Sequence, residues 1–418
     1  MFESIPWRKI IYVAVFLIAI FIIGLLLYMA FFAPDTSDQD NQNGQPANGA
    51  LPDVNGGINR AVDTNTNGGA AVRITNVSLP APTAVANGGK TLAPALVDTQ
   101  SRFLSLAGNG VDMQYFDPLT GKFYKIDRTG AQRTLMTDQT FKGVDEVSWA
   151  PNKELAVMTF KDGANITYDF RTNSQVTLPS ELQEFSFSPD SSTLAAKFIG
   201  PNEGDNWLAI INADGSEARV IEPLGEKVNQ VTVNWSPGAQ VVATYQQSIN
   251  AERQEIIPLG IQGENFKSIE TSGRGFQGMY DQSGARLLYS VHNSSSAYNP
   301  ELFIVQSQGE NIGKNNQRLG VNTWPDKCSF SSNANTVYCA VPIGLPRGSG
   351  LYPELADALP YEFYQIDIAS GTRQLLAQPT DSSGTAQYSV NKVFLSAQGD
   401  MLYFSDSQGL IRTIKLQS

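Results

Sequence analysis

A unit of about 40 to 50 residues recurs along the chain from residue 75 onward, and this repetition limits the fold more than any other feature. Each unit begins with an apolar segment, a tight turn and a second apolar segment, as in VSWAPNKELAVMTF (147–160), FSFSPDSSTLAAKF (185–198) and VNWSPGAQVVATY (233–245). A hairpin follows, as in KFYKIDRTGAQRTL (122–135) and NWLAIINADGSEARVI (206–221). Four short strands cannot cover their own apolar face, so such units stack around an axis until the ring closes. The pattern predicts an all-β fold, a β-propeller.

The number of blades follows from the hairpins that carry the turn. Six such hairpins are recognisable, and an N-terminal unit around residues 103–135 adds a seventh. The last unit shows three strands before Ser418, and we expect the segment near Val72–Thr75 to supply the fourth, because open sheet edges invite aggregation. We therefore predict seven blades within residues 72–418, with six or eight as the alternatives.

The turn after the first strand is similar to that of a known repeat family. Ser188–Asp190 (Ser-Pro-Asp) and Ser236–Gly238 (Ser-Pro-Gly) resemble the turn of the TolB-type, WD40-like β-propeller repeats, and the resemblance covers most of residues 75–418. It implies the fold and says almost nothing about function, because propellers carry many unrelated activities. It does not extend to the mixed α/β domain that precedes the propeller in TolB itself, so a TolB-like role in envelope integrity is not implied.

The N-terminal region predicts a membrane anchor. Residues 10–33 are 24 consecutive residues without a charge, a length that matches the hydrocarbon core of a bilayer. Basic residues precede this stretch and acidic residues follow it, so we expect residues 1–9 in the cytoplasm and the rest of the chain outside the cytoplasmic (inner) membrane. The alternative is a cleaved signal peptide, but the apolar run is long for one, and Tyr28 and Phe31 stand where its cleavage site needs small residues. We predict a single-pass signal-anchor helix.

Residues 34–71 form a segment of different composition. The segment has no aromatic residue, is rich in Asn, Gly, Asp and Gln, and shows no apolar periodicity. Such a segment cannot bury enough apolar surface to offset the entropy lost on ordering it. We expect a disordered linker that spans on the order of 35 Å and holds the propeller away from the membrane.

Composition and motifs exclude several classes of function. The chain has 40 acidic and 29 basic residues, a formal charge of −11, which is not the electrostatic pattern of a nucleic-acid-binding protein. A single histidine, His292, excludes mechanisms that need two imidazoles, and we expect it to be a surface or hydrogen-bonded side chain. No nucleophile elbow or phosphate-binding glycine loop occurs, and residues 212–217 predict a hairpin turn rather than a calcium loop. No catalytic residue, cofactor or metal is predicted.

The two cysteines fall within one predicted hairpin. Cys328 and Cys339 flank the turn SSNAN. If residues 332–335 form the loop, the cysteines lie directly opposite each other on paired strands, at a separation that a disulfide can bridge. An extracytoplasmic location permits that bond. The alternative is a pair of small buried thiols in the core of the blade.

Loop lengths indicate one face of the ring as the binding face. The first turn of each legible repeat is short, whereas the connections between the second and third strands are expanded at residues 200–206, 247–253, 292–301 and 342–361. These connections all emerge on the same face, because each lies at the same end of its strands. Aromatic and arginine side chains are typical of binding hot spots, and the candidates here are Trp207, Arg253, Tyr298, Arg347, Tyr352 and Tyr361. The alternative is that the loops differ only in length and cover the central channel.

Together these features predict a non-enzymatic scaffold that is tethered to the membrane and binds a protein or peptide of the cell envelope. The alternative is a glycan- or small-molecule-binding protein, or a hydrolase or lyase, that uses the central channel of the propeller. A pair of carboxylates about 5–10 Å apart in that channel would favour the alternative, and an apolar plug would count against it. A purely structural propeller is a third interpretation.

Overall fold

The computed structural model describes residues 81–417. All of these residues belong to one compact unit. The predicted anchor at 10–33, the predicted linker at 34–71 and the predicted closing strand at Val72–Thr75 all lie outside the described residues. No helix within residues 81–417 is long and apolar enough to cross a membrane.

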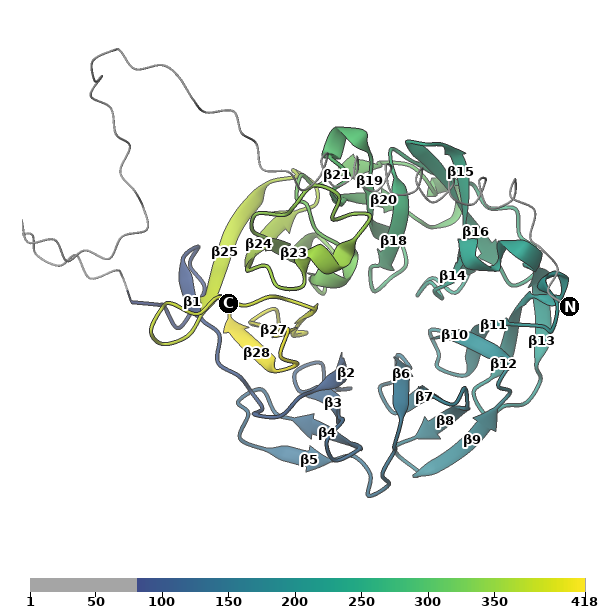
Figure 1. Ribbon diagram of the computed structural model, residues 1–418, viewed down its shortest axis with the longest axis horizontal. Helices are drawn as coiled ribbons and strands as arrows, with labels where there is room; N and C mark the ends of the chain where they lie inside the picture. Colours follow the sequence, from purple (N-terminus) through teal and green to yellow (C-terminus); the bar gives the residue numbers. More distant parts are fainter. Residues whose placement is uncertain (1–80, 418) are drawn as a thin grey trace, which may run out of the picture. The chain divides into compact units, whose positions relative to one another are not determined.

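The described residues form seven β-sheets arranged as the blades of one ring (Figure 1), which confirms an all-β fold with seven blades. Each blade is an antiparallel meander whose strands we call A, B, C and D in chain order. The A strands surround the centre of the ring and the D strands lie at its edge, as the labels β2, β6, β10, β14 and β18 show in Figure 1.

The strands of the seven blades are as follows. Blade 1 has β2 (Arg102–Leu106), β3 (Met113–Asp117), β4 (Lys122–Ile126) and β5 (Arg133–Leu135). Blade 2 has β6 (Val144–Trp149), β7 (Leu155–Phe160), β8 (Asn165–Asp169) and β9 (Ser174–Leu178). Blade 3 has β10 (Leu182–Phe187), β11 (Thr193–Phe198), β12 (Trp207–Asn212) and β13 (Arg219–Pro223). Blade 4 has β14 (Val231–Val233), β15 (Val241–Asn250), β16 (Arg253–Gly260) and β17 (Ile269–Thr271). Blade 5 has β18 (Arg274–Tyr280), β19 (Arg286–His292), β20 (Glu301–Gln306) and β21 (Gln317–Arg318). Blade 6 has β22 (Cys328–Phe330), β23 (Thr336–Pro342), β24 (Tyr361–Asp367) and β25 (Arg373–Thr380). Blade 7 has β26 (Lys392–Leu395), β27 (Met401–Ser405) and β28 (Ile411–Lys415).

The turn between strands A and B is the same in all seven blades. One residue of each turn has a positive φ between 53° and 73°, and its N–H donates a hydrogen bond of 2.8 to 3.1 Å to the carbonyl three residues earlier. This left-handed conformation favours residues without a bulky side chain. The residues at this position are Gly110, Lys153, Ser191, Ala239, Gly284, Ala334 and Gly399. Six of the seven are small, and Lys153 of blade 2 is the exception.

Buried apolar side chains fill the boundaries between blades. Seven clusters of such side chains occur among the described residues, one at each boundary around the ring. Between blades 1 and 2, the ring of Phe123 meets the ring of Trp149 edge to face, with the ring centroids 5.6 Å apart. Because each buried side chain of this kind stabilises the fold by about 1.5–3 kcal/mol, adjacent blades hold one another in place.

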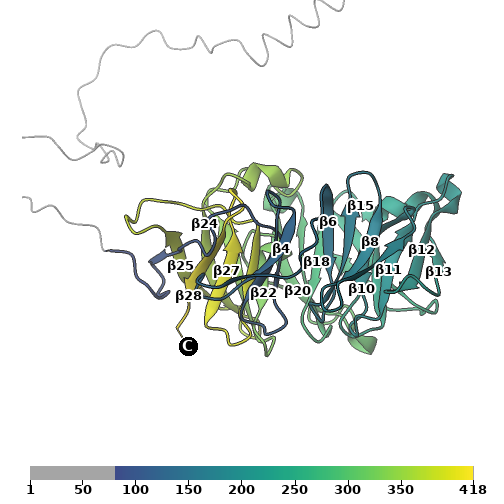
Figure 2. The ribbon, with the colours of Figure 1, turned by 90° about the horizontal axis from the view of Figure 1, so that it is seen from below.

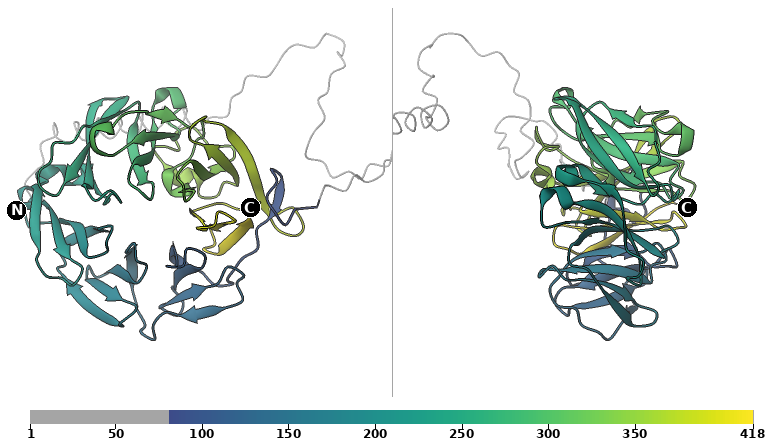
Figure 3. Two further views of the ribbon diagram at one scale, coloured as in Figure 1. Left: turned by 180° about the vertical axis from the view of Figure 1, so that it is seen from behind. Right: turned by 90° about the vertical axis from the view of Figure 1, so that its right-hand side faces the viewer.

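A segment that precedes blade 1 closes the ring. Its strand β1 (Lys90–Leu92) pairs in parallel with β25 at the outer edge of blade 6. The chain then runs beside β28, where the N–H of Leu96 donates to the carbonyl of Ile411 at 2.7 Å and the N–H of Thr413 donates to the carbonyl of Pro94 at 3.1 Å. Residues 94–96 therefore occupy the fourth-strand position of blade 7. From the sequence we predict the segment near Val72–Thr75 at this position, and the structure corrects that prediction. Figures 1 and 3 show the C-terminal strands, in yellow, next to the first blade, in blue.

The cysteines belong to strands A and B of blade 6. Cys328 of β22 lies directly opposite Cys339 of β23 in the strand register. The two residues form a disulfide, with their Cα atoms 4.1 Å apart. The bond ties the innermost strand of the blade to its neighbour.

The two ends of the strands define two faces of the ring, which Figure 2 shows edge-on. The B–C connections and the links from each D strand to the next blade lie at one end, which we call the B–C face. The A–B and C–D turns lie at the other end, because neighbouring strands within a blade are antiparallel. One expectation about these connections is wrong. Residues 247–253 are not a loop but the tip of the β15–β16 hairpin, in which Gln247 pairs with Glu255 and Asn250 with Arg253.

Candidate functional site

Connections from blades 4, 5 and 6 join into one continuous structure on the B–C face. The N–H of Ser294 in blade 5 donates to Oε2 of Glu252 at the tip of the blade 4 hairpin, at 2.8 Å. In the other direction, the N–H of Gly348 in blade 6 donates to the carbonyl of Ala297 at 3.0 Å, and the N–H of Gly350 donates to the carbonyl of Tyr298 at 2.8 Å. We call residues 248–253, 293–300 and 343–360 the blade 4–6 ridge.

Local sequence fixes the shape of the two longer connections in the ridge. In blade 5, the short helix η3 (Ser294–Ser296) is held by a reciprocal cap, in which Asn293 accepts from the N–H of Ser296 and the hydroxyl of Ser296 accepts from the N–H of Asn293. Ala297 and Tyr298 then turn the chain with positive φ values of 54° and 57°. In blade 6, the short helix η6 (Pro353–Ala356) begins at a proline, a residue that suits the first turn of a helix.

Exposed apolar side chains gather on this face. Seven large hydrophobic side chains are exposed within the described part of the chain, and six of them lie on or beside B–C connections. Five of these six belong to the blade 4–6 ridge: Ile249, Ile343, Leu351, Tyr352 and Leu355. The sixth, Leu119, lies on the B–C turn of blade 1. Contiguous exposed apolar surface is uncommon on soluble proteins and marks interaction sites.

The structure brings four of the predicted binding residues together on the ridge. Arg347 and Tyr352 are exposed, and 59% of the Tyr352 surface is accessible. Tyr298 is half-buried in the blade 5 connection. Arg253 opens β16, and its guanidinium forms an ion pair with Glu270 of β17. The ridge thus presents aromatic and arginine side chains beside aliphatic ones.

The other two predicted residues do not join this group. Trp207 opens β12 in blade 3, where it is half-buried and paired with Phe198 and Pro223 on the neighbouring strands. Tyr361 is only 3% exposed and packs in the core between blades 6 and 7, so its assignment as a surface contact residue is corrected. The alternation of β24 places Tyr361 on the same buried face as Phe363, and burial raises the pKa of its phenol.

His292 lies beneath the ridge. It is the last residue of β19, is 8% exposed, and its ring meets that of Tyr298 edge to face, with the ring centroids 6.5 Å apart. Burial lowers the pKa of His292, the positive charge of Arg274 lowers it further, and the carboxylate of Glu252 acts in the opposite direction. Burial therefore disfavours the charged form of the imidazole, whose ring packs against Tyr298 of the connection above it.

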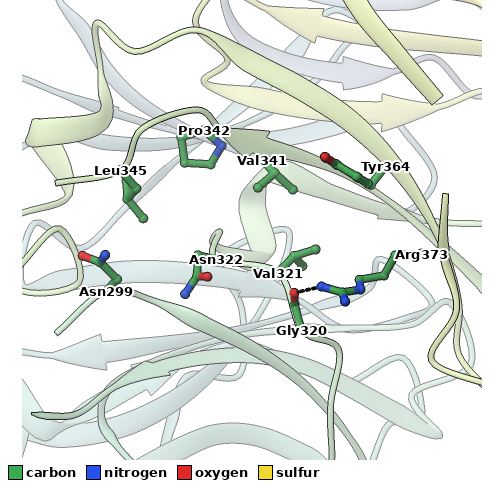
Figure 4. A pocket seen from close by; sticks show the side chains of 9 residues that line it. All are labelled: Asn299, Gly320, Val321, Asn322, Val341, Pro342, Leu345, Tyr364 and Arg373. Carbon is green, nitrogen blue, oxygen red and sulfur yellow. Dashed lines mark hydrogen bonds between the residues drawn. The ribbon is translucent and has the colours of Figure 1, made fainter. Parts of the chain in front are cut away.

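A polar groove of about 590 Å³ runs from the ridge down between blades 5 and 6 (Figure 4). Asn299 and Leu345 of the ridge line one end of the groove, at the left of Figure 4, and Tyr364 and Arg373 of blade 6 line the other end, at the right. The guanidinium of Arg373 donates to the carbonyl of Gly320 across the groove. Because the groove continues the ridge, a partner seated on the ridge would find hydrogen-bonding groups beside it.

A second cavity, of about 570 Å³, lies at the inner rim of the ring and was not predicted from the sequence. Its lining comes mainly from the A strands of blades 7, 1 and 2, and we call it the inner-rim cavity. Three cationic residues line it, Arg102, Lys153 and Lys392, and no Asp or Glu does. Phe103, Trp149 and Phe394 add aromatic surface.

The electrostatics of the inner-rim cavity are unusual for an acidic chain. Burial lowers the pKa of Lys153, and the positive charge of Lys392 lowers it further. Lys392 lines the cavity and keeps accessible surface, yet burial of its ammonium also lowers its pKa. The negative charge of Asp326 raises this pKa, and the positive charge of Lys327 lowers it. Within residues 81–417, none of the three cations that line the cavity forms an ion pair.

Carboxylates do occur on neighbouring A strands, but they do not line this cavity. Glu146 lies on β6 and Glu184 on β10, and burial, together with the charges of Glu184 and Asp145, raises the pKa of Glu146. Glu184 is already paired with Lys197, at 2.6 Å. The inner-rim cavity is therefore neither an acidic pocket nor filled by an apolar plug. In the described part of the chain, no group of three or more His, Cys, Asp or Glu side chains is placed to hold a metal ion.

Comparisons with known proteins support the fold. No family model and no curated protein matches the chain. Among solved structures, an oligogalacturonate lyase in complex with manganese is similar at 11% identity and a TM-score of 0.54, over 78% of this chain and 93% of that one. The β-propeller domain of Cps50 (Swd1) from Myceliophteria thermophila has 12% identity and a TM-score of 0.49, over 78% of this chain and 100% of that one. TolB from Acinetobacter baumannii has 14% identity and a TM-score of 0.41, over 65% of this chain and 64% of that one. At 11% identity the likeness to the oligogalacturonate lyase shows the β-propeller fold alone.

Proposed function

We propose that this protein is a propeller tethered outside the cytoplasmic membrane that binds a protein or peptide of the cell envelope through the blade 4–6 ridge. The observation that carries the proposal is the gathering of exposed apolar side chains: five of seven such side chains among residues 81–417 lie on the ridge. The charge-free stretch at residues 10–33 and the polar segment at 34–71 support the tethered location.

The ridge has the composition of a binding site for protein. Leu351, Tyr352 and Leu355 supply exposed apolar surface, and the exposed side chains of Arg347 and Glu354 stand in the same connection. Interfaces commonly combine an apolar centre that contains aromatic residues and Arg with a charged rim. The partner we expect therefore presents an apolar patch with charged groups around it.

The ridge is also ordered before any partner binds. The backbone N–H of Ser294 donates to the carboxylate of Glu252 and joins the connections of blades 4 and 5, and backbone–backbone hydrogen bonds join those of blades 5 and 6. A surface held in its binding conformation loses less entropy on association than a loop that must first be ordered. This arrangement favours a binding role over connections that merely differ in length.

Substitution of the apolar side chains tests the proposal. Leu351→Ser combined with Leu355→Ser removes exposed apolar surface and leaves the buried core intact. We expect capture of the envelope partner by the full chain, in membranes of the native host, to fall about tenfold or more, with an unchanged midpoint of thermal unfolding. Leu119→Ser, on the same face in blade 1, is the matched control and should capture normally. Undiminished capture by the double variant would contradict the proposal.

A second candidate function uses the centre of the ring. The inner-rim cavity favours it, since its volume of about 570 Å³ is within the range of pockets for small molecules. The similar solved structure of an oligogalacturonate lyase carries the same fold, and a glycan- or small-molecule-binding protein, hydrolase or lyase stays the alternative on this basis. This alternative predicts that substitutions in the cavity, and not on the ridge, abolish function.

A further inference from the structure

We propose that the inner-rim cavity binds a small organic anion, whose carboxylate or phosphate group lies against Lys153 and Lys392 and whose body packs on the aromatic lining. The inference does not depend on partner binding by the ridge. It is carried by the composition of the cavity, by the position of Lys153 in the repeat, and by the lack of a counter-charge.

The charge of the side chains that line the cavity is opposite in sign to the net charge of the chain. The protein has more acidic than basic residues, 40 against 29, yet three cations and no carboxylate line this cavity. Arg102 lies over the ring of Phe103, with its Cζ atom 4.7 Å from the ring centroid, and the ammonium of Lys392 lies 5.6 Å from the centroid of Phe394. Such contacts stabilise a cation only modestly, so the cavity keeps a positive field for a ligand.

Lys153 occupies a left-handed backbone position that disfavours a long side chain. It has a φ of 62° at the turn position that is Gly, Ala or Ser in the other six blades. A long side chain is less stable in the left-handed region than glycine is. The turn itself therefore gains nothing from lysine. What the residue adds is its side chain, which lines the inner-rim cavity.

The two lysines also lack a protein counter-charge. Lys392 has Asp326 in its surroundings, but Asp326 is already paired with Lys327, at 3.2 Å. Lys327 itself donates to the carbonyl of Asn391 at 2.6 Å. Among residues 81–417, no carboxylate forms an ion pair with Lys153, and the positive charge of Lys392 acts on it. Two like charges that line one cavity without a counter-charge repel each other, and an anion between them would relieve that repulsion.

The shape of the lining indicates an organic anion rather than a simple ion. The cavity of about 570 Å³ is large for a lone inorganic ion and suits a molecule with a carbon skeleton. Phe103, Trp149 and Phe394 offer apolar faces beside the cations, and serine and asparagine side chains complete the lining. Carboxylate and phosphate are the groups that lysine ammoniums bind most strongly.

The test uses three ligands with the same sugar body. Glucuronate carries a carboxylate, glucose 6-phosphate carries a phosphate, and glucose carries neither. We expect calorimetric titration of the full chain at constant ionic strength to show one or both anions binding about tenfold or more tightly than glucose. The anion that binds better identifies the acidic group. Equal affinity for glucose and the anions, or no binding of either anion, would overturn the inference.

A pair of variants assigns the binding to the cavity. Lys153→Gln combined with Lys392→Gln should weaken anion binding about tenfold or more. It should also raise the unfolding temperature of the ligand-free protein, because the repulsion between two like charges is removed. Lys125→Gln combined with Lys415→Gln, two exposed lysines outside the cavity, is the control and should bind as before. The single variant Lys392→Gln serves if the double variant does not fold. Unchanged anion binding in the cavity variants would overturn the inference, and partner capture by the ridge should be unaffected in all of them.

Discussion

Gly350 of blade 6 lies so close to His292 of blade 5 that a Cβ atom at Gly350 would stand 2.6 Å from the Cβ of His292. The same position would also bring a Cβ within 2.7 Å of the carbonyl oxygen of Tyr298, which accepts the hydrogen bond from the N–H of Gly350. The blade 6 connection, which carries most of the exposed apolar side chains, is therefore seated on blade 5 at a point where only glycine fits.

This close contact predicts the effect of adding a single methyl group at Gly350. Gly350→Ala should displace the blade 6 connection from blade 5 while the seven blades stay folded, because the clash lies at the surface of the ring and not in a core cluster. We expect partner capture to fall severalfold and limited proteolysis to cut within residues 343–360 more readily. Gly204→Ala, in the B–C connection of blade 3, is the matched control, since an added Cβ there meets nothing within 4 Å. Equal capture by the two variants would contradict this account of the ridge.

The single histidine gives a direct probe of the same region. Burial and Arg274 lower the pKa of His292 below its ordinary value of about 6.5, so the unfolded chain binds a proton at a pH where the folded chain does not. The contribution of His292 to the free energy of unfolding is then fully present above that ordinary value, and it is lost as the pH falls below it. A proton NMR titration of the one imidazole should show the lowered pKa.

Two substitutions beside His292 should move that pKa in opposite directions. Glu252→Gln removes a negative charge that raises the pKa, so it should lower the value further. Arg274→Gln removes a positive charge that lowers the pKa, so it should raise the value. Shifts of the same sign in both variants would mean that these charges do not act on the imidazole as the structure places them.

The disulfide between Cys328 and Cys339 should be detectable in the purified protein. We expect a maleimide to label the denatured chain only after reduction. Reduction should lower the free energy of unfolding by about 2–3 kcal/mol, as expected for a short closed loop. The variant with both cysteines changed to alanine is the control, because reductant should leave its stability unchanged. Labelling without reduction, together with an unfolding midpoint that reductant does not alter, would favour two buried thiols.

Closure of the ring should depend on the segment before blade 1. Leu96 is buried among Met401, Tyr403 and Ile411 of blade 7, so Leu96→Ala should destabilise the protein by about 2–4 kcal/mol. Leu119→Ala changes a side chain that is 86% exposed and should alter stability by less than about 0.5 kcal/mol. Chemical denaturation of both variants measures the difference. Similar stabilities would show that residues 94–96 do not hold blade 7.

The repeats made the ring predictable, and the reason lies in their turns. Motifs such as the Ser-Pro-Asp of Ser188–Asp190 recur because each blade needs the same left-handed turn, so six hairpins and the N-terminal unit could be counted from the sequence. The closing segment could not be found in this way. Residues 90–96 do not repeat, and they pair with β25 and β28, which lie near the other end of the propeller sequence.

The candidate sites were predicted only in part, and tertiary contacts explain the rest. Residues 247–253 are polar and read as a loop, but pairing with β16 makes them the tip of a hairpin. Tyr361 follows a loop and could have faced either side of its strand; the neighbouring blade determines that it is buried. The inner-rim cavity combines Arg102, Lys153 and Lys392, and no local sequence pattern connects these three residues. One signal is present in the repeats, because Lys153 stands at a turn position that small residues occupy in the other six blades.

Site-specific photo-crosslinking tests the central claim most directly. A photoreactive residue in place of Tyr352, on the ridge, is compared in the native host with one in place of Asn335, an exposed residue of the A–B turn of the same blade. We predict that the Tyr352 probe gives one dominant adduct with an envelope protein, that the Asn335 probe does not, and that Leu351→Ser combined with Leu355→Ser removes the adduct. No protein adduct at Tyr352 from a folded chain, or the same adduct from both positions, would contradict partner binding by the blade 4–6 ridge.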